Sequence, residues 1–184
     1  MVLLYDRTFV AGTFRDALRL RWRYYLGLAG TWILLAWLVA GTTGRGGTAG
    51  FGTTVGPWSY LLTQCQAIVR YLRLTVWPDP LVFDYGTATV SRFGAVWPQA
   101  LVLVALAAGT GAALASRPVW GFIGAWFFVI MAPSSSFVPV ASQTMAEHRM
   151  YLPLAAVVIV AVAGLHAWLG RRGFLVCGAL AAAL

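Results

Sequence analysis

Four long apolar runs constrain the fold of this 184-residue chain more than any other feature of its sequence. None of them contains an acidic residue or an arginine. A helix needs about 20 mainly apolar residues to cross the hydrocarbon core of a bilayer, because each residue advances it by about 1.5 Å. We therefore predict an all-α fold, a polytopic bundle of transmembrane helices, with spans at about 24–41, 98–116, 119–132 and 152–170 and the start of a fifth at 173–184.

The overall composition agrees with a membrane protein. Charged residues make up 10% of the chain and hydrophobic residues 60%, whereas about 25% of the residues in a typical soluble domain are charged. The 13 basic residues are all arginines and exceed the five acidic ones, which in a soluble protein would suggest nucleic acid. Here the arginines lie between apolar runs, so membrane topology and lipid phosphates explain them better, and we expect no nucleic-acid partner.

Neither end of the chain carries a complete span. Residues 1–4 are too few for the apolar core of a signal peptide, and the apolar run from 173 to 184 is shorter than a span requires. We expect residues 1–184 to be a single membrane domain that is truncated at both ends.

The arginines between the runs predict an orientation. If the runs alternate in direction, the arginines at 15–23, 117 and 171–172 all fall on one side of the membrane. The positive-inside rule assigns that side to the cytoplasm. The longer segments 42–97 and 133–150 then face outward. Arginines on that side run against the trend and need another explanation: Arg45, Arg70, Arg73, Arg92 and Arg149.

One outward segment, about 58–77, has the pattern of an amphipathic helix. Its polar stripe recurs at spacings of three and four residues: Thr63, Gln66, Arg70, Arg73 and Trp77. One interpretation is an interfacial helix whose arginines reach lipid headgroups. The other is a pair of guanidinium groups, one helical turn apart, that hold a phosphate by bidentate hydrogen bonds. The spacing alone leaves both open.

Two aspartates follow this helix in "WPDPLVFDYG". Asp79 stands between two prolines and Asp84 precedes Tyr85 and Gly86, so a role in turns explains both. Either could also position a substrate hydroxyl.

The stretch "MAEHRMYLPL" places three ionisable residues at the start of an apolar run. The spacing from Thr144 to Glu147 matches a capping box, in which Glu147 would cap the next helix. That role leaves His148 and Arg149 unexplained, and a cation at a helix start opposes the helix dipole. Ionisable residues at a membrane rim are candidates for function, so we predict a binding site with Glu147, His148, Arg149 and Tyr151, the last on the same helix face as Glu147.

No metal or cofactor signature is present in the sequence. Cys65 and Cys177 are isolated, and His166 has no second ligand at a helical spacing. Neither a glycine-rich phosphate loop nor a metalloprotease motif occurs. We predict no metal site and no cofactor, and the need for a divalent metal stays open.

Parts of this sequence resemble bacterial multi-span membrane proteins that have tetratricopeptide repeats after the membrane part. The resemblance lies in four stretches: "YLLTQ", "YLRLTVWPDPLVFDY", "PSSSFVPV" and "MAEHRMYLPL". They also resemble the eukaryotic transmembrane and tetratricopeptide-repeat O-mannosyltransferases of the GT-C glycosyltransferase superfamily. The eukaryotic motif reads approximately Ala-Glu-Arg-x-x-Tyr-x-Pro. Ala146, Glu147, Tyr151 and Pro153 match it, whereas His148 occupies the arginine position and Arg149 follows one place later.

This resemblance, over roughly residues 1–175, implies an enzyme of the bacterial inner membrane that works on its extracytoplasmic face. Such an enzyme transfers a sugar from a polyprenyl-phosphate carrier to a protein hydroxyl. Arg70, Arg73 and Arg149 would hold the phosphate, with Glu147 and His148 orienting one of them or the substrate. The catalytic acid of GT-C enzymes is expected upstream of Met1, and the repeats after Leu184.

Two other classes stay open. A transporter or channel fragment would carry polar stripes in several spans, and the runs after residue 97 have almost none. A membrane scaffold without chemistry is compatible with the composition.

Overall fold

The fold comes from a computed structural model that describes residues 1–40, 55–82, 85–86, 88–133, 135, 144–170 and 178. These residues form helices and irregular segments with no strand among them, which confirms the predicted all-α class. Of the expected fifth span, 173–184, all but residue 178 lies outside this description.

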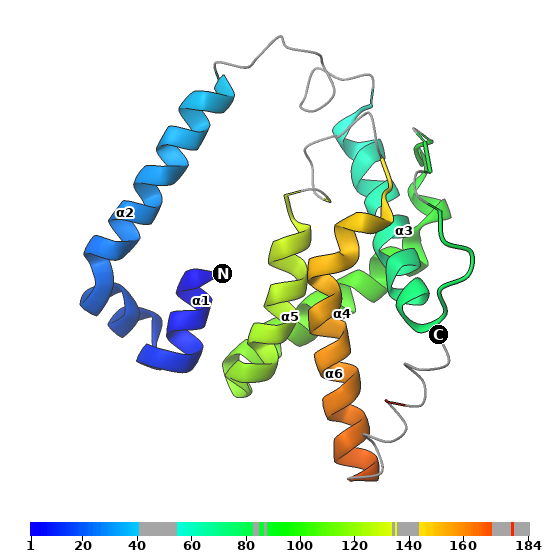
Figure 1. Ribbon diagram of the computed structural model, residues 1–184. Coiled ribbons are helices and arrows are strands. Elements are labelled where there is room, and N and C mark those ends of the chain that lie inside the picture. Colours follow the sequence, from blue (N-terminus) through cyan, green and yellow to red (C-terminus); the bar gives the residue numbers. More distant parts are fainter. Residues whose placement is uncertain are drawn as a thin grey trace.

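Figure 1 shows the helices along the chain. Their bounds are α1 (Val2–Asp6), the π-helix η1 (Arg7–Ala11), α2 (Phe14–Ala40), α3 (Pro57–Val76), the 3-10 helix η2 (Phe93–Ala95), α4 (Trp97–Ser116), α5 (Pro118–Met131), the 3-10 helix η3 (Glu147–Met150) and α6 (Tyr151–Leu169).

Prolines define several helix ends. α3 and α5 begin at Pro57 and Pro118, because proline has the φ of a first helical residue and needs no hydrogen bond to its nitrogen there. α3 ends before Pro78, because the residue preceding a proline disfavours the helical conformation. Trp77 is accordingly extended, with φ −139° and ψ 97°.

The N-terminal segment packs on α2 around a buried carboxylate. Asp6 is 2% exposed, accepts a hydrogen bond from the Tyr25 hydroxyl at 2.6 Å and lies 3.3 Å from the Arg21 guanidinium. Arg21 is at a break within α2, with φ −127° and ψ 28°. From η1, Arg7 donates a 2.8 Å hydrogen bond to the carbonyl of Leu114, which ties this segment to the last turn of α4.

Helices α4 and α5 form a hairpin that two glycines allow to close tightly. A Cβ atom on Gly121 would lie 2.3 Å from the backbone nitrogen of Leu114, and one on Gly124 would lie 2.5 Å from Oγ1 of Thr110. Both distances are too short for a real contact. At Gly121 the backbones of the two helices therefore come into contact, and at Gly124 the side chain of Thr110 occupies the space that a Cβ would need.

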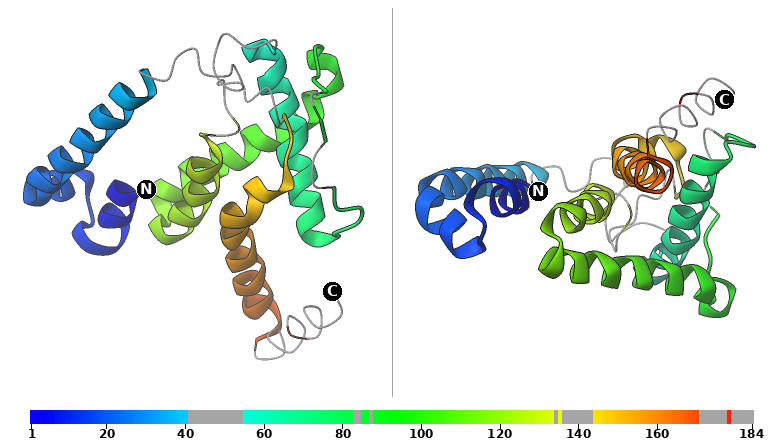
Figure 2. Two further views of the ribbon diagram at one scale, coloured as in Figure 1. Left: turned by 45° about the horizontal axis from the view of Figure 1, so that its top comes forward. Right: turned by 90° about the horizontal axis from the view of Figure 1, so that it is seen from below.

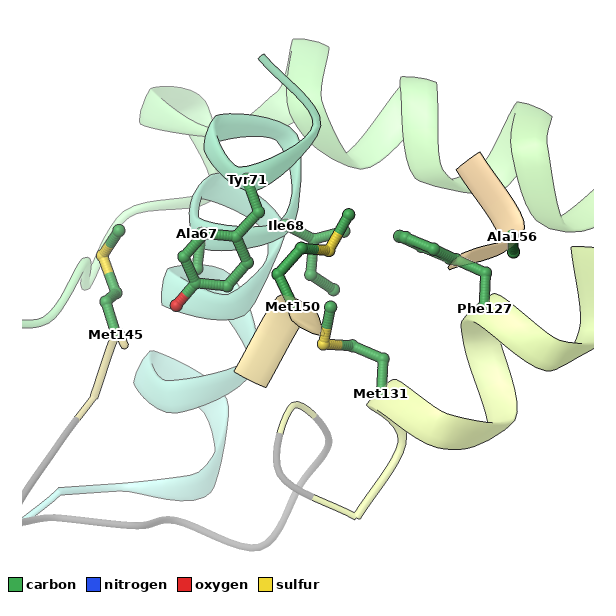
Figure 3. Packing of buried hydrophobic residues seen from close by; sticks show 8 residues of the cluster. All are labelled: Ala67, Ile68, Tyr71, Phe127, Met131, Met145, Met150 and Ala156. Carbon is green, nitrogen blue, oxygen red and sulfur yellow. The ribbon is translucent and has the colours of Figure 1, made fainter. Parts of the chain in front are cut away.

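The main core joins α3, α5, the segment before η3, and the start of α6. Figure 3 shows its methionines and aromatic rings converging between these elements. The buried cluster consists of Ala67, Ile68, Tyr71, Phe127, Met131, Met145, Met150 and Ala156. Because Met131 ends α5 and Met150 precedes α6, the core fixes which ends of these two helices meet.

Two helical stretches, Trp97–Ser116 and Glu147–Leu169, are long and apolar enough to cross a membrane, and α5 is a shorter apolar helix. No residue of α4 is buried. Figure 2, in its right-hand view, shows α6 nearly end-on while α4 extends across the picture, so the two helix axes lie at a steep angle to each other. This differs from a regular bundle, and the reason is that α4 packs on the amphipathic α3 as well as on α5.

Candidate functional site

The buried face of α3 carries the polar groups that build the site. Thr63 was expected on the polar stripe with Gln66 and Arg73, yet Thr63 is buried while Gln66 and Arg73 are exposed. That expectation was wrong because Thr63 has partners inside: its hydroxyl donates to the Ser59 carbonyl at 2.7 Å and accepts from the Val90 nitrogen at 2.9 Å.

The segment before η3 lies along this face and is held by its backbone. The Gln64 amide donates to the Thr144 carbonyl at 2.7 Å, and the Ala146 nitrogen donates to the Tyr71 hydroxyl at 2.6 Å. Gln64 and Tyr71 are each 1% exposed, so both bonds lie in the interior. These two bonds orient the chain that presents Glu147.

The capping box expected between Thr144 and Glu147 does not form. The Thr144 hydroxyl bonds instead to the carbonyls of Gly86 and Ala88, at 2.9 and 3.1 Å. The cap position of η3 is Ala146, which makes no side-chain cap. Thr144 therefore anchors Gly86 and Ala88 and leaves the Glu147 carboxylate for other donors.

Glu147 links η3 to Val82 and Tyr85, which lie more than 60 positions earlier in the sequence. Its Oε1 accepts a hydrogen bond from the Val82 nitrogen at 2.9 Å and another from the Tyr85 hydroxyl. The same hydroxyl accepts from Nε of Arg70 at 3.1 Å, and the guanidinium carbon lies 4.7 Å from the centre of the Tyr85 ring. One tyrosine thus bridges a cation and a carboxylate while stacking on the cation.

The environment keeps the tyrosines of this site protonated. Burial, with the hydrogen bond to Glu147 second, raises the pKa of Tyr85. Burial also raises the pKa of Tyr71 to about 12. At neutral pH both hydroxyls are intact, so Tyr85 can donate to Glu147 while accepting from Arg70.

Two adjoining hollows flank this bridge. A small polar one of about 70 Å³ is lined by Arg70, Arg73 and Asp79. A larger one of about 230 Å³ is mainly aliphatic and also lined by Glu147 and Tyr151. Leu74 lines both hollows, so the polar hollow and the mainly aliphatic one are neighbours on α3.

The remaining predicted residues are distributed unevenly. Arg149 is half-buried and donates to the Tyr60 hydroxyl at 3.2 Å, and His148 is exposed. Tyr60 and Arg70 are ten positions apart on α3, about 15 Å along its axis. Arg149 therefore lies toward the N-terminal part of α3, rather than beside Arg70 and Arg73.

Asp84 falls outside the described residues. Tyr85 and the buried Asp6 are not among the site residues predicted from the sequence. Tyr85 was visible in the stretch "YLRLTVWPDPLVFDY", which the resemblance already singled out. Asp6 had no comparable signal beyond an acidic residue beside apolar ones.

Among the residues that the structure describes, no three His, Cys, Asp or Glu side chains lie close enough to hold a metal ion. The polar groups at the bridge and its hollows include two arginines, two carboxylates and tyrosine hydroxyls. Guanidinium groups beside an apolar hollow suit an anionic group attached to a hydrocarbon.

Comparisons with protein-family models, with curated proteins and with solved structures find no match to this chain.

Proposed function

We propose that this chain is a multi-pass domain of the bacterial inner membrane. The apolar helix α4 supports this, because none of its residues is buried although it is long enough to span a bilayer. The core helix of a soluble protein would be covered, and a signal sequence would lie near the N-terminus. In water α4 would expose apolar surface along its whole length, whereas in a bilayer the same surface contacts lipid.

The proposed orientation places the site on the extracytoplasmic side. Met131 and Met150 share the core, so the end of α5 and the start of α6 lie together. Arg117 precedes α5, at the other end of that pair, where the positive-inside rule puts it in the cytoplasm. Glu147 begins η3, three residues before Met150, and so belongs to the outer end.

We infer that the domain is part of a glycosyltransferase that takes a sugar from a polyprenyl-phosphate carrier and transfers it to a protein hydroxyl. The observation that carries this proposal is the pairing of the hollow at Arg70 and Arg73 with the adjoining apolar hollow. The two guanidinium groups hold the phosphate, and the first isoprenoid units lie along Leu74. Glu147 holds Arg70 in place through Tyr85.

A transport path through the helices has less support. The hydroxyls of Thr110 and Ser116 in α4 donate to carbonyls of their own helix, at 2.8 and 2.9 Å. They are satisfied locally and give a solute no continuous polar route. Arg70, Arg73 and Glu147 lie at the proposed outer end, where a surface enzyme needs them.

Cysteine labelling in intact cells tests the orientation. In a background with Cys65 and Cys177 replaced by serine, Asp79→Cys is expected to react with an impermeant maleimide. Arg117→Cys, the matched exposed position at the opposite end, is expected to react only after permeabilisation. The reverse pattern would put the arginines in the cytosol, away from a flipped lipid carrier.

A binding measurement tests the proposed ligand. The chain in nanodiscs is expected to bind farnesyl phosphate but not farnesol, and Arg70→Ala is expected to weaken the phosphate-dependent part about tenfold or more. Arg92→Ala, which replaces an exposed arginine that lines neither hollow, is the matched control. Equal binding of the phosphate and the alcohol would refute the assignment.

A further inference from the structure

Tyr85 has a geometry that a simple packing residue does not need. Its hydroxyl accepts from Nε of Arg70 and donates to Oε1 of Glu147, while its ring lies under the guanidinium. All three side chains are half-buried, so the contacts are partly shielded from water.

The point of contact on the guanidinium decides what the rest of the group can do. An arginine carries five N–H donors in a planar fork, and Tyr85 occupies the one on Nε. The two terminal nitrogens lie farther along the fork, and Arg70 lines the small polar hollow with Arg73 and Asp79. A fork fixed through Nε and through its face retains its terminal edge for a bidentate anion.

Glu147 determines the direction of the tyrosine hydroxyl. Because the carboxylate can only accept, the Tyr85 proton points to Glu147 and the oxygen lone pairs face Arg70. The Val82 nitrogen holds the same carboxylate oxygen at 2.9 Å. The chain of bonds thus runs in one sense, from Arg70 to Tyr85 to Glu147.

We propose that Tyr85 is a positioning residue that orients Arg70 for binding a phosphate-bearing ligand, an inference that rests on the proposed function. It acts through Arg70 and does not itself touch the ligand. Removing its hydroxyl leaves the charge of Arg70 in place but frees the fork to rotate, so affinity falls while the apolar contacts remain.

A double-mutant cycle separates this role from a structural one. Binding of farnesyl phosphate is measured in nanodiscs for wild type, Tyr85→Phe, Arg70→Ala and the double variant, with farnesol as the neutral probe. Tyr85→Phe is expected to weaken the phosphate-dependent binding about tenfold, and to have no further effect when Arg70 is already alanine. Tyr24→Phe, an exposed tyrosine on α2, is the matched control.

Arg70→Lys gives a second measurement that does not depend on the folding of Tyr85→Phe. Lysine keeps the charge but lacks the fork, and is expected to weaken binding at least as much as Tyr85→Phe. Wild-type affinity in Arg70→Lys or in a folded Tyr85→Phe would overturn the positioning role alone. An equal loss from Tyr85→Phe in both Arg70 backgrounds would show a structural role instead. No phosphate-dependent binding by wild type would overturn both this inference and the proposed function.

Discussion

Replacing Glu147 tests whether its carboxylate holds Val82 and Tyr85 against η3. The carboxylate accepts from the Val82 nitrogen and the Tyr85 hydroxyl, residues 65 and 62 positions earlier in the chain. Glu147→Ala removes both bonds, whereas Glu147→Gln keeps an acceptor oxygen and removes only the charge. The two variants therefore separate the charge from the hydrogen bonds.

The expected magnitudes follow from the burial of the three residues. A hydrogen bond to a charged group contributes about 1.5–3 kcal/mol, and one between neutral groups about 0.5–1.5 kcal/mol. Because Glu147, Val82 and Tyr85 are all half-buried, the lower ends of these ranges apply. We expect Glu147→Ala to lower the free energy of unfolding by about 3 kcal/mol, and Glu147→Gln by about 2 kcal/mol.

Thermal unfolding in detergent micelles, followed by circular dichroism at a helix wavelength, measures both changes. For a chain of this size 1 kcal/mol shifts Tm by about 2–4 °C, so Glu147→Ala is expected to melt about 6–12 °C below wild type. Asp16→Asn is the matched control, because Asp16 accepts a hydroxyl bond from Thr13 at 2.6 Å but is exposed. If Glu147→Ala has the same melting temperature as Asp16→Asn, the Glu147 carboxylate does not hold Val82 and Tyr85 against η3.

Two further predictions concern stability. Gly121→Ala forces a Cβ against the Leu114 backbone, so we expect it to destabilise the hairpin by about 1–3 kcal/mol. Gly111→Ala meets nothing within 4 Å and should gain about 0.8–1 kcal/mol of helix propensity; equal melting temperatures for the two variants would contradict the close approach. Burial raises the pKa of Tyr71 from 10.0 to about 12, so the folded state keeps this proton where the unfolded state loses it. Its contribution to stability is complete below pH 10 and falls by about 2–3 kcal/mol as pH rises through 12. Tyr71→Phe, compared with wild type by unfolding at pH 9 and pH 12, should show a smaller alkaline loss, despite an overall cost from the unpaired nitrogen of Ala146.

The positions of the helices could be predicted because local features define them. The amphipathic helix expected at about 58–77 is α3, Pro57–Val76, with a proline at its start and another just after its end. The apolar runs at 98–116 and 152–170 correspond to α4 and α6. In each case the apolar run and the residues that start or stop a helix lie within the segment itself.

The contacts of the site could not be predicted, because each depends on a partner far away in sequence. The spacing of Thr63 assigns it to the polar stripe, but in the structure it is buried and its hydroxyl accepts a hydrogen bond from the Val90 nitrogen. The position of Thr144 matches a capping box, but in the structure its hydroxyl donates to the carbonyls of Gly86 and Ala88 instead. Helical periodicity describes one element at a time and contains no information on which loop will cover it.

A tyrosine between Arg70 and Glu147 suits the proposed ligand better than a direct ion pair would. A carboxylate bound directly to the guanidinium would engage its fork and neutralise the charge that attracts a phosphate. An intervening tyrosine hydroxyl fixes the arginine at Nε, and the negative charge of Glu147 then lies on the far side of that hydroxyl. The positive potential at the hollow of Arg70 and Arg73 is thereby reduced less, while the orientation is still held. On this argument Tyr85→Glu, which would bring a carboxylate next to Arg70, should impair binding of farnesyl phosphate more than Tyr85→Phe does.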